Sequence, residues 1–469
     1  MDTPAPFPKK SAALPILIVV ILAAAVLSQP VPRVFEAIGI DFYNFWGVPV
    51  ALRLTGHTLD SPYTQGPRYS EVLKQYAATA NQPKLTAAAR FWAGPDYTAS
   101  PLLYAAFAVV SSDYAASLQA FQIVQMLSFV AAFLLLGHVY RVGVLHLLFL
   151  TLLCFVSYQP LLSDLRVGNL GCLQFLYLTV VLYLASALPR VTAFGRRAWL
   201  AATLLSALAL LTLFKPNVAL VGVLLAIHLL VRYGRRLFLI AAVPAAIVAA
   251  VALGVASLYF HSWTVWRDWY RFVYGANAYM LVRPVTQGNY STVVLLSSWL
   301  GVDVYVVGVV LAALLGLSLI VASVRSRGSS WSPAALWRNT LTSVFADPRV
   351  ALAIGVLVTV AVSPVYWLHY YVVTLIPSLW FLNSSTFARS RGTLAAVAVV
   401  MSSGLLGVLL WALRWPDAVP ATVALSWLPL WGALLVGIHT PESGDRRDGA
   451  TAAGKPTPSG AGGGRRHKR

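Results

Sequence analysis

The side chain with the clearest chemical potential in this sequence is the carboxylate of Asp41, in the stretch IGIDFYNFW shortly after the first long apolar segment. Only 10% of the residues are charged, so an acid among aromatic residues at the edge of an apolar segment is a candidate functional group. Such a carboxylate can accept the proton of an attacking hydroxyl group. The alternative is a structural role, as a helix N-cap or as the partner of Arg33 or Arg53.

Basic side chains that suit an anionic ligand occur at the ends of later apolar segments. Lys215 lies in FKPN, Arg166 in SDLRVGNLG, Arg271 in a tryptophan-rich stretch, and His369 in SPVYWLHYY. A lysine at the centre of a membrane helix costs roughly 2.5 to 3.5 kcal/mol, so a partly buried Lys215 should have an anionic partner. Cations bind phosphate through charge-assisted hydrogen bonds. The alternative for the tryptophan-rich stretch is an aromatic belt at the membrane interface. The alternative for His369 is a structural role.

Amide, hydroxyl and aromatic side chains that suit a sugar occur in the same stretches. We expect a sugar or acceptor to contact Asn169, Asn289 and Ser291 of GNYS, Tyr43 and Trp367. A carboxylate, several cations and aromatic rings on one face suit an anionic phosphate headgroup beside a polyol. An apolar cleft between helices would hold a lipid tail. These residues therefore predict lipid-linked glycosyl transfer.

The elements that must position these residues are transmembrane helices. The chain is 59% hydrophobic, which excludes a soluble globule. A membrane β-barrel would show segments of alternating polarity, whereas the apolar runs here are continuous. We therefore expect an all-α polytopic membrane protein, and the first apolar run is interpreted as a retained span because SQPVPR after it lacks a small-x-small cleavage site.

About twelve spans are predicted from the apolar runs. They are Ala12–Leu27, Leu118–Tyr140, Val142–Ser157, Leu170–Leu188, Trp199–Phe214, Asn217–Val231, Leu237–Phe260, Val304–Val324, Val350–Val365, Tyr370–Leu382, Thr393–Leu413 and Val419–Ile438. The segment Pro101–Val110 is assigned to a loop because it is too short to cross a hydrocarbon core of about 30 Å as a helix.

The charge distribution orients these spans. With both termini cytoplasmic, the cytoplasmic segments hold 22 Lys and Arg against 5 Asp and Glu, and the external segments hold 12 against 10. The formal net charge of +19 is thus concentrated on one side, as the positive-inside rule requires. We therefore attribute the positive charge to membrane topology and expect no nucleic-acid partner.

The predicted domain organisation follows from the same spans. Residues 1–440 form the membrane domain, with a long first external loop over 28–117 and a second over 261–303. The first loop is expected to be an ordered domain on the outer membrane surface, with a short amphipathic helix over Tyr69–Ala80. Residues 441–469, rich in Gly, Pro and basic residues, are expected to be a disordered cytoplasmic tail beside membrane lipids.

The order of the motifs resembles a known family. DFYNFW after the first span, followed by RVGNLG, LFKPN, GNYS and SPVYWLHYY, is similar to glycosyltransferase family 87, which are membrane enzymes of the GT-C fold. The resemblance covers roughly Ile38–Leu382 and implies a polyprenyl-phosphate-sugar donor, typically with mannose, used on the outer face of the plasma membrane. It implies Asp41 as the catalytic aspartate, Lys215 and His369 near the donor phosphate, and Asn289 near the sugar. The stretch RVGNLG departs from the Gly-Gln-x-Asn pattern of the family. The resemblance therefore does not assign a role to Asn169.

The expected reaction is inverting transfer to the hydroxyl group of a lipid or glycan acceptor. Polyprenyl phosphate leaves as a stable anion, so a single base, Asp41, suffices. Lys215 and His369, helped by Arg166 or Arg271, would stabilise the phosphate. We expect no metal and no other cofactor, since no carboxylate cluster offers ligands. The alternatives are a membrane transporter or lipid flippase, or transfer of another sugar such as arabinose.

Overall fold

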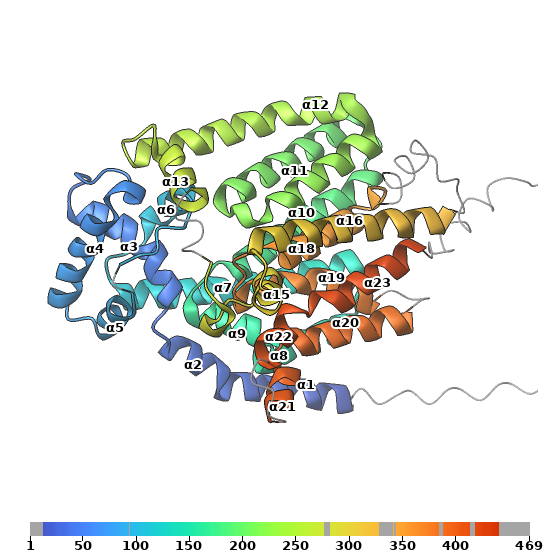
Figure 1. The fold of residues 1–469 in the computed structure, drawn as a ribbon, viewed down its shortest axis with the longest axis horizontal. Coiled ribbons are helices and arrows are strands. Elements are labelled where there is room, and N and C mark those ends of the chain that lie inside the picture. The colour runs from blue at the N-terminus through green and yellow to red at the C-terminus, as the bar shows by residue number, and fades with distance from the viewer. Residues whose placement is uncertain are drawn as a thin grey trace, which may run out of the picture.

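The computed structural model describes residues 13–92, 94–275, 282–327, 341, 344–383, 388–412 and 418–439. Within these ranges the chain is helical, apart from loops and a single β-bridge between Asn289 and Trp367. The helices form an elongated bundle, with a group of short N-terminal helices at one end (Figure 1). The predicted tail, 441–469, lies outside the described residues.

The helices of the described chain divide into three sets along the sequence. The N-terminal set is α1 (Ala13–Ser28), α2 (Pro30–Glu36), α3 (Ile40–Leu54), α4 (Pro62–Thr79), α5 (Pro83–Phe91), α6 (Pro101–Ala106) and η1 (Phe107–Val109). The central set is α7 (Tyr114–Tyr140), α8 (Val144–Ser157), α9 (Gln159–Val167), α10 (Gly171–Ala187), η2 (Leu188–Arg190), α11 (Phe194–Phe214), η3 (Pro216–Val218) and α12 (Ala219–Tyr259). The C-terminal set is α13 (Val265–Tyr274), η4 (Val285–Gln287), α15 (Thr292–Leu300), α16 (Val304–Arg327), α18 (Pro348–Val362), η5 (Leu368–Thr374), α19 (Leu375–Asn383), α20 (Ala388–Ser402), α21 (Leu405–Ala412), α22 (Ala418–Ala424) and α23 (Trp427–His439).

Among the described residues, 7 helical segments are long and apolar enough to cross a membrane, or 8 if the bent pair α8 and α9 is one span. The 7 segments are Leu17–Glu36, Tyr114–Tyr140, Gly171–Arg190, Phe194–Phe214, Pro216–Tyr259, Val304–Arg325 and Ala418–Ile438. The all-α polytopic membrane class is therefore confirmed. The predicted count of about twelve spans is not confirmed.

One long segment, helix α12, contains two of the predicted spans because it breaks at Gly234, where φ is 82° and ψ is 167°. As a straight helix its 41 residues would extend about 60 Å. The segments that lead into and out of it nevertheless meet the same short helix, α6. The hydroxyl of Ser100, the N-cap of α6, donates to the carbonyl of Phe214 at the end of α11 (3.1 Å). Phe260, just after α12, packs on Tyr104 of α6 (6.5 Å between ring centroids). The chain therefore turns back at the break.

Three predicted C-terminal spans differ from the helices observed. The segment Val350–Val365 corresponds to the 15-residue α18, which ends before the Ser-Pro pair at 363–364. Tyr370–Leu382 is no single helix, because a 3-10 stretch, η5, precedes the 9-residue α19. Thr393–Leu413 is divided between α20 and α21 at Gly404, whose φ is 78°. Local backbone breaks, which hydropathy does not register, account for these differences.

The predicted first external loop folds as an ordered group of helices with its own core. Helices α2, α4, α5 and α6 each begin with a proline in the first turn, where its missing N–H costs nothing. The core contains buried aromatic rings, among them Phe42, Trp46, Tyr69 and Tyr104. The amphipathic helix predicted over 69–80 is part of α4, and 101–110 contains only α6 and the short η1, as expected of a loop.

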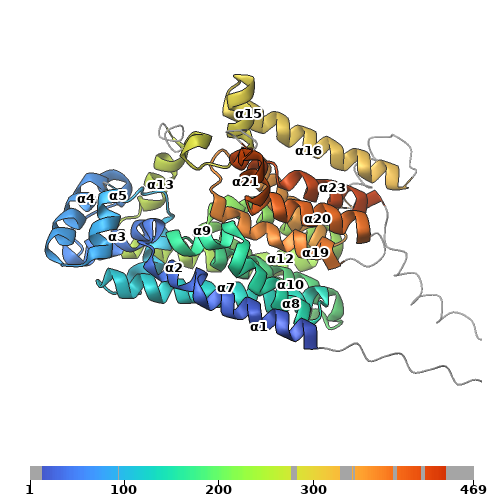
Figure 2. The same cartoon turned by 90° about the horizontal axis from the view of Figure 1, so that it is seen from below.

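The predicted second long loop lies beside this group. Helix α13 packs against α4 and α6. Helix α15 follows later in the same predicted loop and packs against α16. Figures 1 and 2 show α13 between the N-terminal helices and the ends of the bundle helices. The two regions that were predicted to be external therefore meet at one end of the bundle.

Candidate active site

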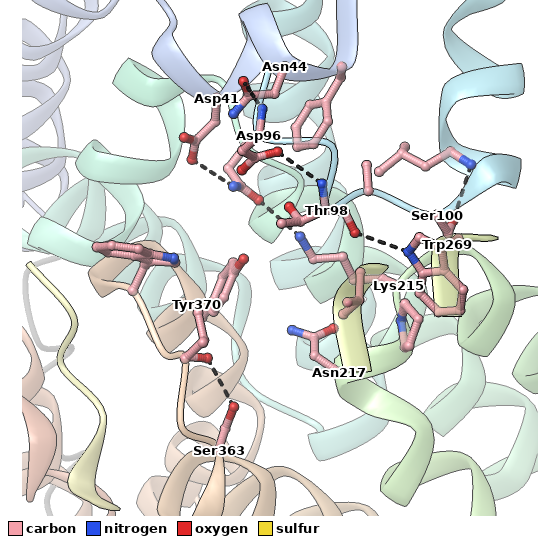
Figure 3. A pocket seen from close by; sticks show the side chains of 18 of the residues that line it. Asp41, Asn44, Asp96, Thr98, Ser100, Lys215, Asn217, Trp269, Ser363 and Tyr370 are labelled. Atoms are coloured by element: carbon pink, nitrogen blue, oxygen red, sulfur yellow. Dashed lines mark hydrogen bonds between the residues drawn. The ribbon is translucent and has the colours of Figure 1, made fainter. Parts of the chain in front are cut away.

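A cavity of about 490 Å³ lies where the N-terminal helices, α13 and the ends of the bundle helices meet (Figure 3). Its volume is in the usual range for small-molecule sites. Its polar and aromatic wall residues include Asp41, Asn44, Trp92, Asp96, Asn169, Lys215, Asn217, Trp269, Arg283, Trp367 and Tyr370. The cavity thus brings together carboxylates, a lysine, amides and aromatic rings from segments far apart in the sequence.

Asp41 occupies the first turn of α3, and its carboxylate lies on the cavity wall. The N-cap of α3 is Gly39, and the structure gives no ion pair between Asp41 and Arg33 or Arg53, so the structural alternative for Asp41 is not supported. Burial raises the pKa of Asp41 from 3.8 to about 7, against the opposing effect of a hydrogen bond from Asn169. A carboxyl group with this pKa can exchange a proton near neutral pH.

Asn169 connects Asp41 to Lys215. Its amide nitrogen donates to the Asp41 carboxylate (Nδ2 to Oδ2, 2.7 Å), and its amide oxygen accepts from Lys215 (Nζ to Oδ1, 3.4 Å). The same oxygen accepts the backbone N–H of Leu170 (2.6 Å), which fixes the orientation of the amide. Asn169, whose role the departure from the family pattern left in doubt, therefore lies at the centre of the site.

The turn between α9 and α10 places Asn169 in this position. Asp164 is fully buried and accepts hydrogen bonds from the first two backbone N–H groups of α10 (2.9 and 2.8 Å). Gly168 ends α9 with φ of 69°, and a β-carbon there would lie 2.7 Å from Cβ of Phe42. Only glycine permits both this backbone conformation and this close approach to α3. The turn thereby sets Asn169 directly against Asp41.

Lys215 lies between α11 and η3, at the tip of the predicted hairpin, and lines the cavity. Its ammonium group contacts the ring face of Tyr370 (4.9 Å to the centroid) and the Asn169 oxygen. Within the described chain no carboxylate oxygen lies within 4.0 Å of it, so the anionic partner expected for Lys215 is not a direct ion pair. Burial lowers the pKa of Lys215, and the carboxylates of Asp41, Asp164 and Asp96 oppose that effect. The ammonium group has donors left for an anionic ligand.

His369 lies behind Asp41, away from the cavity surface. Its Nε2 is 3.7 Å from Oδ2 of Asp41, the residue is only 5% exposed, and it does not line the cavity. Burial lowers the pKa of His369 well below its ordinary value, and nearby Lys215 adds to this effect. The neutral ring therefore faces the carboxylate, and its expected contact with a phosphate has no geometric support here.

Asn289 and Ser291 hold two loops together and do not line the cavity. The Asn289 amide donates to the carbonyls of Arg283 (2.8 Å) and Pro364 (2.9 Å), and its oxygen accepts the N–H of Tyr366 (2.9 Å). The Ser291 hydroxyl donates to the Ser363 carbonyl (2.6 Å) and caps α15, and both residues are fully buried. These contacts leave neither side chain free for a sugar, in contrast to the expectation from GNYS.

The remaining predicted residues divide between the cavity and its surroundings. Trp367 lines the cavity, as a ring that stacks on a sugar should. Tyr43 does not, because it is 1% exposed and packs in the aromatic core against Trp46 (6.3 Å between centroids). Arg166 at the end of α9 and Arg271 on the exposed side of α13 are also absent from the wall. The arginine that does line it is Arg283, which is exposed.

Wall residues that were not predicted from the sequence include Asn44, Asp96 and Asn217. Asn44 follows Asp41 by three positions on α3, so helical periodicity would place both on one face. Asn217 follows Lys215 in the FKPN stretch and accepts a hydrogen bond from Gln174 (3.1 Å). Asp96 lies in a loop without periodicity, where only an acid between Pro95 and an aromatic residue marked it.

The described residues contain no group of three or more His, Cys, Asp or Glu that could hold a metal ion. The two cysteines, Cys154 and Cys172, are buried and free. Comparison of the chain with protein-family models, curated proteins and solved structures found no match.

Proposed function

We propose that this protein is an integral-membrane inverting glycosyltransferase of the GT-C type, similar to glycosyltransferase family 87. It transfers a hexose, in our proposal mannose, from a polyprenyl-phosphate donor to a hydroxyl group of a lipid or glycan acceptor. The observation that carries this proposal is that Asp41 and Lys215 line the same cavity, separated by the single amide of Asn169. A carboxylate that can accept a proton and a cation that can bind phosphate thus face one cavity.

The reaction needs one base and one anion-binding group. The acceptor oxygen attacks the anomeric carbon, a new C–O bond forms, and the bond to the phosphate oxygen breaks with both electrons leaving on the phosphate. The acceptor proton passes to Asp41, whose raised pKa of about 7 makes it a stronger base than an exposed carboxylate. Polyprenyl phosphate leaves as a stable anion beside Lys215, so no acid has to protonate it. Attack opposite the phosphate inverts the anomeric centre.

The surrounding residues suit these two tasks. Asn169 orients the Asp41 carboxylate and keeps the Lys215 ammonium group close to the same cavity. The rings of Trp92, Trp269 and Trp367 on the walls offer faces on which a sugar can stack. No described acid within 4.0 Å neutralises Lys215, so a phosphate would be its first charged contact partner.

The arrangement of arginines supports a cavity on the external face of the plasma membrane. Arg196 and Arg197 lie in the first turn of α11, whereas Lys215 follows its last turn. Arg236 beside the break in α12 stacks on Phe194 (5.2 Å), so the basic residues of both helices gather at the end opposite the cavity. Arginines concentrate on the cytoplasmic side. We propose that both termini share that side; 1–12 and 440–469 lie outside the described residues.

The test is transfer of radiolabelled mannose from a polyprenyl-phosphate donor by the purified full-length protein, with a panel of lipid and glycan acceptors. Asp41→Asn should lower the rate by about 10²- to 10⁴-fold, the usual contribution of a general base. Asp60→Asn is the matched control, because Asp60 belongs to the same N-terminal region but is exposed and does not line the cavity. Near wild-type transfer by Asp41→Asn, or transfer from a nucleotide sugar alone, would contradict the proposal.

A further inference from the structure

The segment 94–100 forms a wall of the cavity that is anchored on both sides. The Asp96 N–H donates to the Asn44 amide oxygen of α3 (3.2 Å), and the Thr98 carbonyl accepts from the Trp269 indole of α13 (3.2 Å). The Ser100 hydroxyl donates to the last carbonyl of α11 (3.1 Å). These bonds hold an irregular loop in one conformation (Figure 3), although it has no regular secondary structure.

Tyr97 directs Asp96 to the cavity. Its φ of 54° is unusual for a residue other than glycine, and its side chain is buried, with the hydroxyl donating to the Gly66 carbonyl (2.6 Å). Asp96 and Thr98 on either side of it both line the cavity. A strained backbone conformation that turns an acid toward a cavity is a common feature of functional sites.

The Asp96 carboxylate has capacity to bind a ligand. Among the described residues its hydrogen-bond partner is Thr98, whose backbone nitrogen lies 3.2 Å from Oδ1. No basic group of the described chain lies within 4.0 Å of it. Two carboxylate oxygens can accept about four hydrogen bonds. Vicinal hydroxyl groups of a sugar would supply such donors, and the ring of Trp92 on the same wall offers a stacking face.

We propose that Asp96 and Trp92 form a subsite for a polyhydroxyl ring of the acceptor. The assignment to the acceptor rests on the proposed glycosyltransferase function. Asn44, which anchors Asp96, follows Asp41 by three positions on α3, so Asp96 shares the wall of the general base. Lys215, the proposed contact of the donor phosphate, lines the cavity from a different element, the hairpin between α11 and α12. The hydroxyl that Asp41 deprotonates belongs to the acceptor, and its neighbouring hydroxyls therefore face Asp96.

The direct test measures binding without turnover, by saturation-transfer-difference NMR of methyl α-D-mannopyranoside with the full-length protein in nanodiscs. We expect a saturable signal with wild type and Asp60→Asn, and at least fivefold weaker binding with Asp96→Asn, which preserves size and loop hydrogen bonding. Cyclohexanemethanol, a ring with one hydroxyl group, should show no dependence on residue 96. Thermal unfolding verifies that Asp96→Asn is folded. If it is not folded, Asp96→Glu is compared instead, because it keeps the negative charge but shifts the carboxylate by one methylene group.

The outcomes separate this inference from the proposed function. Unchanged affinity of the residue-96 variant, or the absence of a saturable signal with wild type, overturns the subsite. Loss of the signal on addition of EDTA would show that a divalent cation carries the contact, which also overturns it. The assignment to the acceptor is tested in Asp41→Asn saturated with decaprenyl-phosphate-mannose. If methyl α-D-mannopyranoside still gives its signal, the subsite is separate from the donor site and belongs to the acceptor. If the signal is lost, the assignment to the acceptor is overturned. The titration without donor decides the subsite even if the transfer assay fails.

Discussion

At the scale of single residues, the carboxyl group of Asp41 is costly to the fold. Its side chain is largely removed from water, with 18% left exposed on the cavity wall, and no Lys or Arg of the described chain lies within 4.0 Å of it. His369 does lie within that distance, but burial lowers its pKa. Its own pKa is raised from 3.8 to about 7, so the charged form of Asp41 is less favourable in the folded protein than in the unfolded chain. A group that destabilises the fold in its charged form is retained where its proton exchange has a use.

This cost predicts a specific effect of pH on stability. The folded pKa of Asp41 exceeds the unfolded one, so its contribution to stability is complete below pH 4 and is lost as pH rises to about 7. Asp41→Asn, which stays neutral, should therefore be more stable than wild type at pH 8, by up to about 4 kcal/mol in the free energy of unfolding, and by much less at pH 5. Thermal midpoints from tryptophan fluorescence in one detergent measure this difference.

Both proteins keep Lys215 and His369, so the difference between them isolates the Asp41 carboxyl group. Asp60→Asn, at an exposed position, should follow wild type at both pH values. A variant Asp41→Asn that unfolds below wild type at pH 8, or that shows the same difference at pH 5 and pH 8, would contradict the assigned burial of the charge.

At the scale of elements, the turn from α9 to α10 aligns the site. Gly168 has φ of 69°, and a β-carbon there would lie 2.7 Å from Cβ of Phe42, next to Asp41 on α3. Gly168→Ala should therefore separate the turn from α3 and lengthen the hydrogen bond from Asn169 to Asp41. The left-handed conformation alone costs about 1 to 2 kcal/mol, and the clash adds to it. We expect a thermal midpoint several degrees lower and a loss of transfer activity.

Gly56→Ala provides the matched control for this clash. Gly56 has a similar φ of 61°, but no atom lies within 4 Å of the β-carbon that would be added. It should therefore show only the conformational cost, with full activity. Equal losses of stability and activity in the two variants would mean that the approach of Gly168 to α3 does not align the site.

The same elements explain which parts of the site could be predicted from the sequence. The places of Lys215 and Trp367 on the cavity wall could be predicted because each follows an apolar segment, and that of Asp41 because an acid among aromatic residues is unusual in a chain with 10% charged residues. The role of Asn289 could not be predicted, because an amide side chain can bind a ligand or a backbone carbonyl equally well. Only the position of the facing loop decides between the two. Asp96 depends on the conformation of an irregular loop, which periodicity does not encode.

At the scale of the whole molecule, the fold class that hydropathy predicted is confirmed, and the predicted count of about twelve spans is not confirmed. Continuous apolar runs identify buried or lipid-facing helices, and these runs include breaks at Gly234 and Gly404 that only the backbone reveals. In this arrangement the cavity and the basic residues of α11 lie at opposite ends of the bundle. The cavity lies at one end of α11, and the arginine pair 196–197 lies at the other.

We expect the cavity end to face outward, because arginines favour the cytoplasmic side. Ser112→Cys, at an exposed position before α7, should react with a membrane-impermeant maleimide in intact cells. Thr192→Cys, at an exposed position before α11 at the opposite end, should react only after permeabilisation. The native Cys154 and Cys172 are buried, so wild type serves as the unlabelled background. The reverse pattern of labelling would place Asp41 and Lys215 on the cytoplasmic side, where an externally presented polyprenyl-phosphate sugar would not reach them.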